Sequence, residues 1–397
     1  MADRPKVMFL LFEGLAATVV ESQVLANVRL LHDRGVADFE VWAFACLDTL
    51  MQSSRSRREP AEQLAQAPVR LFRALRPLTF LTYAVNVLLL IWHLYPHRRE
   101  FSHIHARTDY STAVAAPAAR LFGLQLLWDC RGDAVAEVEE RFAGRSALFG
   151  LLVRLRLWEL RGYTKIAGQF CNTVLFVTDE LHRLHRDLVG NKPVEVVPCA
   201  AHEDLFFFDS DLRIETRSRL GYLEGEMVYI YSGSLGEYQC FNETVAHFAA
   251  YYQADPSSRL LVLTPAVEEA CRALKDLPPS SYTVRSCTLE EVNAYLNAAD
   301  VGFLLRKPIR TNYVASPTKF AEYGLSGLAV LTSDAVPWAH RIAIEAGNLA
   351  PIVDGLPGHV KLDRPKIAAR FRALVGRETF VNCFRRLYVP EATMVDD

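Results

Sequence analysis

Residues 315–331, ASPTKFAEYGLSGLAVL, carry the strongest fold signal in the chain. Ser316 is a favourable N-cap and Pro317 suits the first helical position, so a helix is predicted to begin there. Gly327 is predicted to end that helix, and residues 328–332 should form the next buried strand. The stretch therefore predicts a helix followed by a strand of a parallel sheet.

The same helix carries charged groups suited to a phosphorylated ligand. The N–H groups at a helix start attract anions. Lys319 adds a cation in this first turn, where it opposes the helix dipole and is better explained by a bound phosphate than by helix stability. Glu322, about one turn further along, can accept hydrogen bonds from sugar or ribose hydroxyls. These residues indicate half of a nucleotide-sugar site; the alternative is an ordinary helix–strand unit with a surface lysine.

Length and composition narrow the class of protein. A chain of 397 residues favours two domains of about 200 residues each. The formal charge of −2 argues against a nucleic-acid binder that works by bulk electrostatics. The eight cysteines lie singly, mostly in apolar runs, which is typical of reduced core residues. With no secretory signal pattern at the N-terminus, we expect a cytoplasmic protein.

Strand-like apolar runs alternate with helical patterns along the whole chain, which is typical of parallel sheets with crossover helices. The predicted strands lie near residues 6–12, 39–46, 103–107, 125–130, 173–177 and 194–197, and then near 227–232, 260–264, 282–286, 301–305, 328–332 and 351–353. We therefore predict an α/β fold with two Rossmann-like domains facing across a central cleft. The predicted domains are residues 1–198 and 199–375, and residues 376–397 should form a C-terminal helix and tail that packs back on the first domain.

Two long apolar segments bear on membrane association. Residues 78–95, LTFLTYAVNVLLLIWHLY, have basic neighbours on both sides, and their length and polar residues favour a buried or interfacial helix over a membrane span. In residues 148–165, LFGLLVRLRLWELRGYTK, Trp158 lies among basic residues, which suits anionic lipid. The alternative is a core helix whose arginines reach solvent. Residues 55–60 are predicted as a solvated loop.

Two strand-to-helix turns could approach a ligand closely. Gly14 follows the first strand, and Thr18 and Glu21 have capping-box spacing, so a helix N-terminus is predicted there. In the second domain, the sequence YSGSLGEY leaves the first strand through glycines and serines. Ser234, Gly236 and the neighbouring backbone amides can then approach a diphosphate.

Cations are predicted at the same edge of the second domain. Arg306 and Lys307 end a strand and Arg310 follows, so they are expected to converge with Lys319 on one anion. Ligands of α/β sheets bind at the carboxyl ends of the strands. The histidines and carboxylates show no recognisable metal-ligand spacing, so we expect no bound metal.

The first domain supplies candidate catalytic residues at two strand ends. Alternation places His105 on one strand face with Arg107, and a histidine near a strand end could hydrogen-bond a donor sugar. Arg131 lies between Asp129 and Asp133, either of which could orient an acceptor hydroxyl. For the histidine, a purely structural role is the alternative.

Residues 316–330, SPTKFAEYGLSGLAV, are similar to the SPxKxxEYLAxGLPV motif of retaining GT-B glycosyltransferases of the family 4 class, and the resemblance covers nearly the whole chain. Glu322 matches the second acid of the family's E-x7-E motif, which implies a contact with the nucleotide ribose. Val314 replaces the first acid. The family's Arg/Lys pair after the first strand of the second domain is also absent, which shifts the expected phosphate contacts to Arg306 and Lys319.

The resemblance implies transfer of a sugar from a nucleotide-sugar donor to a glycan or lipid-linked acceptor, with retention and without a metal or other cofactor. Bacterial envelope polysaccharide or glycolipid synthesis is the expected setting, with attachment to an anionic membrane surface at the inner face and no nucleic-acid partner. The expected donor-binding residues are Gly14, Ser234, Gly236, Arg306, Ser316, Thr318, Lys319 and Glu322. The expected catalytic residues are His105, Arg131 and Asp133.

Two other functions remain open from the sequence. Nucleotide-sugar 2-epimerases share the GT-B architecture and need no acceptor, although the carboxylates and base they require cannot be placed here. A non-catalytic nucleotide-sugar-binding protein is favoured by the missing first acid and the altered glycine loop.

Overall fold

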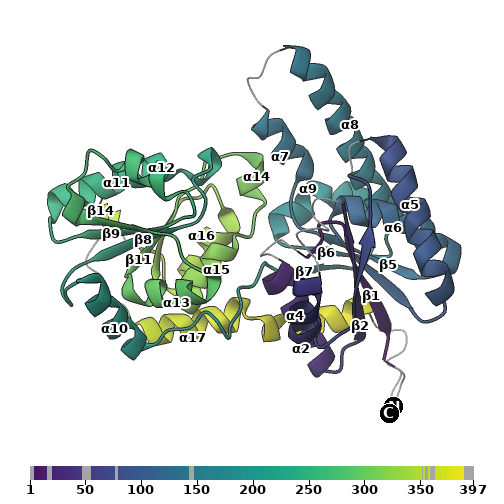
Figure 1. The fold of residues 1–397 in the computed structure, drawn as a ribbon, viewed down its shortest axis with the longest axis horizontal. Helices are drawn as coiled ribbons and strands as arrows, with labels where there is room; N and C mark the ends of the chain where they lie inside the picture. Colours follow the sequence, from purple (N-terminus) through teal and green to yellow (C-terminus); the bar gives the residue numbers. More distant parts are fainter. Residues whose placement is uncertain are drawn as a thin grey trace. The chain divides into compact units, whose positions relative to one another are not determined.

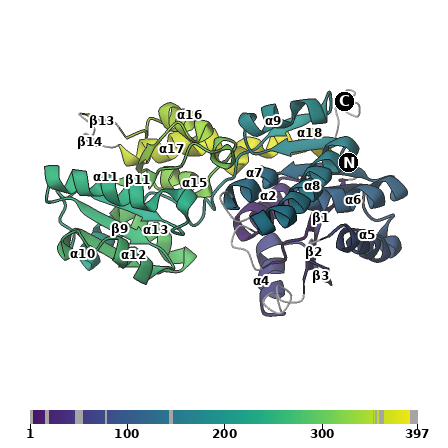
Figure 2. The same ribbon diagram turned by 90° about the horizontal axis from the view of Figure 1, so that it is seen from above.

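The computed structural model describes residues 4–15, 20–46, 55–76, 79–142, 147–350, 352–353, 356–357 and 363–388. Contacts within the chain divide it into two compact units. Unit 1 comprises Met1–Pro198 together with Arg377–Asp397, and unit 2 comprises Cys199–Gly376. Each unit is built on its own parallel sheet, shown from two directions in Figure 1 and Figure 2.

Unit 1 contains a seven-stranded parallel sheet with the strand order β3-β2-β1-β4-β5-β6-β7. Its strands are β1 (Lys6–Leu11), β2 (Asp38–Ala45), β3 (Val69–Arg73), β4 (His103–Arg107), β5 (Gln125–Cys130), β6 (Thr173–Phe176) and β7 (Val194–Val196). Strand β1, KVMFLL, is almost continuously apolar because helices cover both faces of the sheet, whereas the neighbouring β4, HIHAR, buries two histidines and an arginine. Sequence analysis missed β3, an edge strand whose VRLFR sequence interleaves arginines with apolar residues.

The helices of unit 1 form one layer on each face of the sheet. They are α2 (Ala26–Asp33), preceded by a π-helical turn (Glu21–Leu25), and then α4 (Arg55–Ala65), α5 (Phe80–Leu94), α6 (Asp109–Phe122), α7 (Ala134–Arg141), α8 (Ala147–Phe170), α9 (Asp179–Val189) and α18 (Val381–Tyr388). One core joins α2, α4 and α18 to β1 and β2. On the other face, α6 packs on β4 and β5 and is flanked by α5 and α8.

The predicted loop at residues 55–60 is wrong, because these residues belong to α4. Arg58 and Glu62 form an ion pair one helical turn apart, with 3.0 Å between Nε and Oε1. Ala61 and Ala65 bury the opposite face of the helix in the core of unit 1. A charge run at the start of an amphipathic helix thus resembles a solvated loop when it is considered alone.

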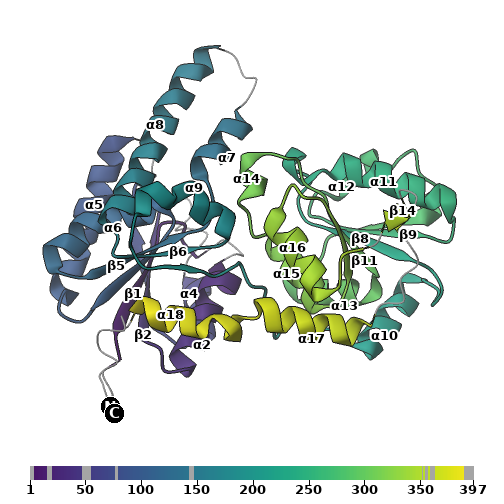
Figure 3. The same cartoon turned by 180° about the vertical axis from the view of Figure 1, so that it is seen from behind.

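The C-terminal helix α18 belongs to the core of unit 1 (Figure 3). Val381, Phe384, Leu387 and Tyr388 are buried there. Polar contacts at the surface also join α18 and the turn before it to the rest of unit 1. Arg386 Nη2 donates to Glu195 Oε2 at 2.8 Å, and Glu378 pairs with Arg34.

Unit 2 contains a five-stranded parallel sheet with the order β10-β9-β8-β11-β12. The strands are β8 (Val228–Ser232), β9 (Arg259–Leu263), β10 (Tyr282–Arg285), β11 (Val301–Leu304) and β12 (Ala329–Thr332). The predicted strand at residues 351–353 does not join this sheet. Ile352–Val353 instead pairs antiparallel with Leu356–Pro357 in a separate two-stranded sheet.

Helices cover both faces of the unit 2 sheet, and each face has its own apolar core. They are α10 (Ser210–Leu220), α11 (Phe241–Ala254), α12 (Val267–Ala273), α13 (Leu289–Ala298), α14 (Arg310–Tyr313), α15 (Thr318–Leu325), α16 (Pro337–Ala346) and α17 (Arg364–Val375). In the described part of the chain, no helix combines the length and apolar character needed to cross a bilayer.

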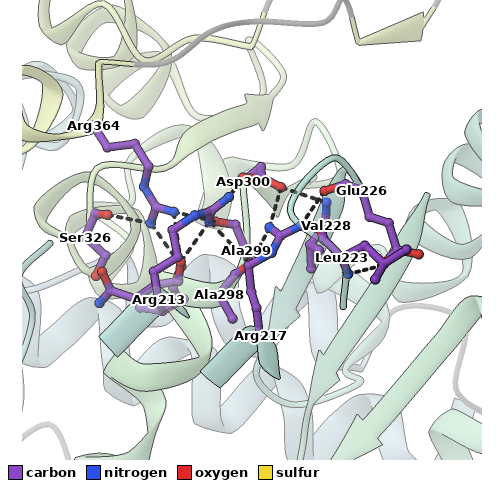
Figure 4. Close-up of polar contacts among 12 residues, drawn as sticks. Arg213, Arg217, Leu223, Glu226, Val228, Ala298, Ala299, Asp300, Ser326 and Arg364 are labelled. Atoms are coloured by element: carbon purple, nitrogen blue, oxygen red, sulfur yellow. Dashed lines mark hydrogen bonds and ion pairs between the residues drawn. The ribbon is translucent and has the colours of Figure 1, made fainter. Parts of the chain in front are cut away.

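Three arginines gather at the start of β11, around the end of α13 (Figure 4). Arg364 donates to the carbonyls of Leu296, Asn297, Ala299 and Ser326 at 2.7–3.2 Å. Arg213 and Arg217 donate to neighbouring carbonyls and to the Asp300 carboxylate. These groups satisfy the carbonyls that a helix leaves unpaired at its C-terminus, where cations are also favoured. We call this group the arginine cluster.

Candidate functional site

The carboxyl edge of the unit 2 sheet gathers most of the predicted donor-binding residues. Strand order reverses between β8 and β11, and ligands of open α/β sheets bind at such a switch point. The loop 233–236 follows β8, and Arg306 follows β11. Lys319 and Glu322 extend from α15, the helix that precedes β12.

Gly233 makes room for the Lys319 ammonium in this edge. Its φ of 140° lies in a region that side-chain-bearing residues rarely adopt. A Cβ added there would lie 1.4 Å from Lys319 Nζ, so no other residue fits without moving the lysine. The ammonium donates to Gln239 Oε1 at 2.8 Å and lies 5.8 Å from the Tyr231 ring centroid. The glycine loop and the helix start are thus in direct contact.

Gln239 connects this lysine to the rest of the loop. Its side-chain amide is buried, and Nε2 donates to Ser234 Oγ at 2.6 Å. The Tyr231 hydroxyl donates to the Ser234 carbonyl at 2.6 Å, and the Tyr323 hydroxyl accepts from the Ser232 amide at 3.1 Å. The loop shape is therefore held by side chains from both β8 and α15. Sequence analysis missed Gln239, which has no motif to mark it.

The charged side chains here have few protein partners. Burial and the nearby Arg306 guanidinium lower the pKa of Lys319 to about 8, and the Glu322 carboxylate opposes this shift only in part. Burial raises the pKa of Glu322 to about 7, against the opposing effect of Lys319. Within the described residues the Glu322 carboxylate accepts no hydrogen bond, and Arg306 donates to the carbonyl of Leu305 at 2.8 Å without an acidic partner. Partly buried charges left this way are suited to a ligand that completes them.

The helix start differs in detail from the prediction. Pro317, not Ser316, is the N-cap, and α15 begins at Thr318. The Ser316 hydroxyl instead accepts a hydrogen bond from the Cys199 amide at 3.0 Å, which joins α15 to the first residue of unit 2. Proline takes the N-cap position with the extended backbone typical of a residue just outside a helix, at ψ 122°. Gly327 follows the helix with a φ of 72°, as predicted for a C-terminal cap.

The structure separates the predicted cations. Arg306 lies close enough to Lys319 for its charge to lower the pKa of the lysine. Lys307 is directed elsewhere, with Nζ 2.5 Å from Glu237 Oε1. Arg310 begins the short helix α14 and is exposed. Val314 is 1% exposed, so an apolar, buried side chain stands where the resembling family has its first acid.

In unit 1, the predicted catalytic histidine lies inside a closed network. His105 is 1% exposed, with Nδ1 2.5 Å from the Tyr388 hydroxyl and Nε2 3.3 Å from Asp129 Oδ2. Arg131 Nε lies 2.7 Å from Asp129 Oδ1. Burial disfavours the Asp129 charge, but Arg131 and His105 outweigh it and lower the pKa of Asp129 to about 2. Both nitrogens of the His105 ring therefore face protein groups, and a contact with a sugar stays a prediction.

The other predicted residues of unit 1 have identifiable structural contacts. Asp133 caps α7, because its Oδ1 accepts from the Ala136 amide at 2.9 Å. Gly14 follows β1 with a φ of 68°, and the adjacent Glu13 pairs with Arg107 at 2.5 and 2.6 Å. Thr18 lies outside the described residues, so the predicted capping box stays a prediction.

Thr108 is a second position that sequence analysis missed. It lies directly after β4, and the strand order of this sheet reverses between β1 and β4. Its φ of 77° and ψ of 161° fall in a region almost restricted to glycine. Backbone strain at a switch point is the feature expected where a ligand is positioned. No group of three His, Cys, Asp or Glu side chains that could hold a metal ion occurs among the residues described.

Comparisons with known proteins identify the architecture. No known protein-family model matches the sequence, and no curated protein matches it. Solved structures do match. HepE from Anabaena in complex with UDP has 15% identity and a TM-score of 0.66, over 98% of this chain and 100% of that chain. The glycosyltransferase WaaG, involved in lipopolysaccharide biosynthesis, has 13% identity and a TM-score of 0.59, over 98% and 96%.

An epimerase is also similar. The putative UDP-N-acetylglucosamine 2-epimerase from Listeria monocytogenes has 13% identity and a TM-score of 0.54, over 97% of this chain and 91% of that chain. At these identities the similarity establishes architecture alone. The chain has the GT-B fold, which confirms the predicted α/β class.

Proposed function

We propose that this protein transfers a sugar from a nucleotide-sugar donor to a glycan or lipid-linked acceptor. The observation that carries the proposal is the contact between Lys319 and the Gly233 loop at the switch point of the unit 2 sheet. A strand-end loop, a helix start and two cations with few partners suit the diphosphate of such a donor. The fold supports the same conclusion, since HepE has been solved with both UDP and UDP-glucose.

Each residue of this edge then has a role in donor binding. Arg306 and Lys319 bind diphosphate oxygens, and the backbone of residues 232–236 approaches them. Glu322 accepts hydrogen bonds from the ribose hydroxyls, the role that the family resemblance implies. Negative charge grows on the diphosphate as it leaves the sugar, so a fixed ammonium and guanidinium stabilise the transition state more than the ground state.

We propose retention of configuration without a metal, as the resemblance implies, with the leaving diphosphate helping to deprotonate the acceptor hydroxyl. The acceptor then binds at the carboxyl edge of the unit 1 sheet, where Thr108 and the Glu13–Arg107 pair lie. Synthesis of a bacterial envelope polysaccharide or glycolipid is the setting we propose.

An epimerase is the second candidate, because a putative 2-epimerase shares the architecture. Product analysis separates the candidates. A transferase consumes the donor faster when an acceptor is present and releases free nucleoside diphosphate. An epimerase converts the donor to an isomer without an acceptor, and a binding protein leaves it intact.

The first test is a thermal-shift panel of UDP-, GDP-, ADP- and dTDP-sugars on the wild type and on Glu322→Ala. A ligand that binds only the folded state raises stability by about 2.7 kcal/mol at 100 times its Kd. We expect a donor-selective rise in Tm that the substitution reduces. No shift with any donor, in a variant and wild type that are both folded, would contradict a donor site at this edge.

A further inference from the structure

The five tryptophans of the chain divide sharply by exposure. Trp42, Trp128 and Trp338 are buried in the cores. Trp92 is 76% exposed and Trp158 is 68% exposed, and both lie on long helices of unit 1, α5 and α8. Fully exposed tryptophan is uncommon on a monomeric surface, and its amphipathic ring favours a membrane–water interface.

On α5, Trp92 belongs to an apolar stripe. Leu81 and Leu88 are also exposed, at spacings of seven and four residues that place all three on one helix face. The helix sequence FLTYAVNVLLLIWHL contains no aspartate, glutamate, lysine or arginine. A solvent-facing stripe of this kind marks an interaction surface.

On α8, Trp158 lies between an apolar and a basic stripe. Leu151 and Leu155 are exposed on the same face as Trp158, at spacings of four and three residues. Arg154, Arg161 and Lys165 are exposed along the adjoining edge of the helix. Among the described residues, Arg161 is the one of these three that pairs with an acid, with its Nη2 2.6 Å from Glu139 Oε1 of α7. Tryptophan and leucine beside arginine and lysine is the composition of helices that lie in a bilayer interface.

The two helices belong to one layer of unit 1. Both pack against α6, and the rings of Tyr83 and Tyr163 join α5 to α8 with 5.4 Å between centroids (Figure 1). Each helix leads into a strand of the parallel sheet and runs antiparallel to it, so both end at the amino edge of that sheet, and the longer α8 projects past the carboxyl edge (Figure 1). The exposed stripes of α5 and α8 can therefore be used together.

We propose that the α5–α8 face, defined by Leu81, Leu88, Trp92, Leu151, Leu155 and Trp158 with the basic edge of α8, docks on an anionic phospholipid bilayer. The positive edge selects an anionic headgroup layer, and the tryptophans and leucines enter its interface. Docking there places the outer surface of the α5–α8 layer of unit 1 against the membrane, which presents a lipid-linked acceptor. That last consequence rests on the proposed transferase function, but the docking itself does not.

The experiment measures vesicle binding by density flotation and by the blue shift of tryptophan emission. The vesicles contain phosphatidylcholine alone or equal parts of phosphatidylcholine and phosphatidylglycerol. We expect binding to the anionic vesicles, weakened by salt, and a loss of roughly tenfold or more in partitioning for Trp92→Ala/Trp158→Ala. The matched control is Ile214→Ala/Ile344→Ala, which removes two exposed apolar side chains of unit 2 and should leave binding unchanged.

A second pair of variants tests the charge. Arg154→Glu/Lys165→Glu should abolish the preference for anionic vesicles, whereas Arg272→Glu/Lys275→Glu, on an exposed part of unit 2, should keep it. Equal binding to neutral and anionic vesicles, or an equal loss in the controls, would overturn the proposal. A dimer in sedimentation equilibrium that only the tryptophan variants dissociate would assign the face to a second copy instead. Because no nucleotide is used, failure here is distinct from failure of the transferase proposal.

Discussion

The two ends of strand β11 carry two groups of positive charge that differ in how their hydrogen bonds are completed. At its start, the arginine cluster donates to backbone carbonyls and to Asp300. At its end, Arg306 and Lys319 have one backbone carbonyl and one amide oxygen as their hydrogen-bond acceptors among the described residues. Both groups are buried or partly buried, yet among the described residues the protein supplies acceptors for most donors of the first group and for few donors of the second.

This difference separates a structural role from a binding role. A buried guanidinium whose two terminal nitrogens donate to the protein, as in Arg364, stabilises the fold, and only its Nε lacks an acceptor among the described residues. An ammonium and a guanidinium with spare donors cost folding free energy until an anion arrives. Perturbed charges therefore indicate a ligand only where their partners are missing.

The largest effect is expected at the arginine cluster. Arg364→Ala removes one donor from each of four buried carbonyls. Among the described residues the Ser326 carbonyl is left without a donor, which costs about 1–3 kcal/mol, whereas the carbonyls of Leu296, Asn297 and Ala299 keep a donor from the Ala299 amide or from Arg213. We expect unfolding free energy to fall by roughly 3–5 kcal/mol in urea denaturation. Nucleotide affinity of the folded protein should stay unchanged. If Arg364→Ala kept the stability of the wild type but lost much of its nucleotide affinity, the arginine cluster would have a binding role and not the structural role assigned to it here.

The second prediction concerns the contact between Gly233 and Lys319. Gly233→Ala displaces the ammonium, because the new Cβ occupies its position. Donor affinity should fall about 10- to 100-fold, the value of one or two charge-assisted hydrogen bonds. In calorimetry, the double variant Gly233→Ala/Lys319→Ala should bind the donor no more weakly than whichever single variant has the lower donor affinity. Fully additive losses would mean that the glycine and the lysine act separately.

The third prediction uses pH at Glu322. Its folded pKa of about 7 exceeds the ordinary value of 4.5, so folding favours the protonated form. The associated stability is present below pH 4.5 and is lost as pH rises through 7. Glu322→Gln should therefore become the more stable protein at pH 8, by on the order of 1 kcal/mol after allowing for partial exposure.

Donor binding should change in the opposite direction. Wild-type affinity should rise through pH 7 as the Glu322 carboxylate becomes able to accept ribose hydroxyls, whereas the Gln variant should show only the titrations of the donor and of Lys319, whose pKa is about 8. Thermal melts and titrations at several pH values measure both quantities. Parallel pH profiles for the two proteins would remove Glu322 from the site.

The smallest effect is expected in unit 1. Tyr388→Phe removes the hydroxyl that lies 2.5 Å from His105 Nδ1 and leaves the buried rings in place. Stability should fall by about 0.5–1.5 kcal/mol, as for one ordinary hydrogen bond. If the network is structural, donor affinity and turnover stay at wild-type values. A selective loss of turnover at full stability would instead support the predicted catalytic role of His105.

Much of the fold follows from the apolar runs of the sequence. The strands at Lys6–Leu11 and Arg259–Leu263 occur within one residue of their predicted bounds, because a strand buried on both faces needs an almost continuous apolar run. Edge strands and exposed helices were harder to predict from the sequence. β3 and α4 interleave arginines with apolar residues, so their local patterns did not separate them from a loop.

The candidate site was predictable where it depends on local sequence. Lys319, Glu322 and Arg306 follow from a helix start and a strand end. Contacts between distant segments could not be inferred in this way. The hydroxyl of Tyr388 contacts His105, although the two residues are 283 positions apart in the sequence. The alternation of side chains along β4 cannot reveal that His105 is buried beneath helix α18. Gln239 holds Lys319 across 80 positions and belongs to no motif.

The most direct test of the donor site compares two lysines of unit 2 by isothermal titration calorimetry. Lys319→Ala removes the ammonium beside Gly233, and Lys307→Ala removes one that is paired with Glu237 at the surface. With the donor identified in the thermal-shift panel, Lys319→Ala should weaken binding about 10- to 100-fold. Lys307→Ala should stay within about twofold of the wild type. Equal losses, or a loss confined to Lys307→Ala, would contradict a diphosphate site at the carboxyl edge of this sheet.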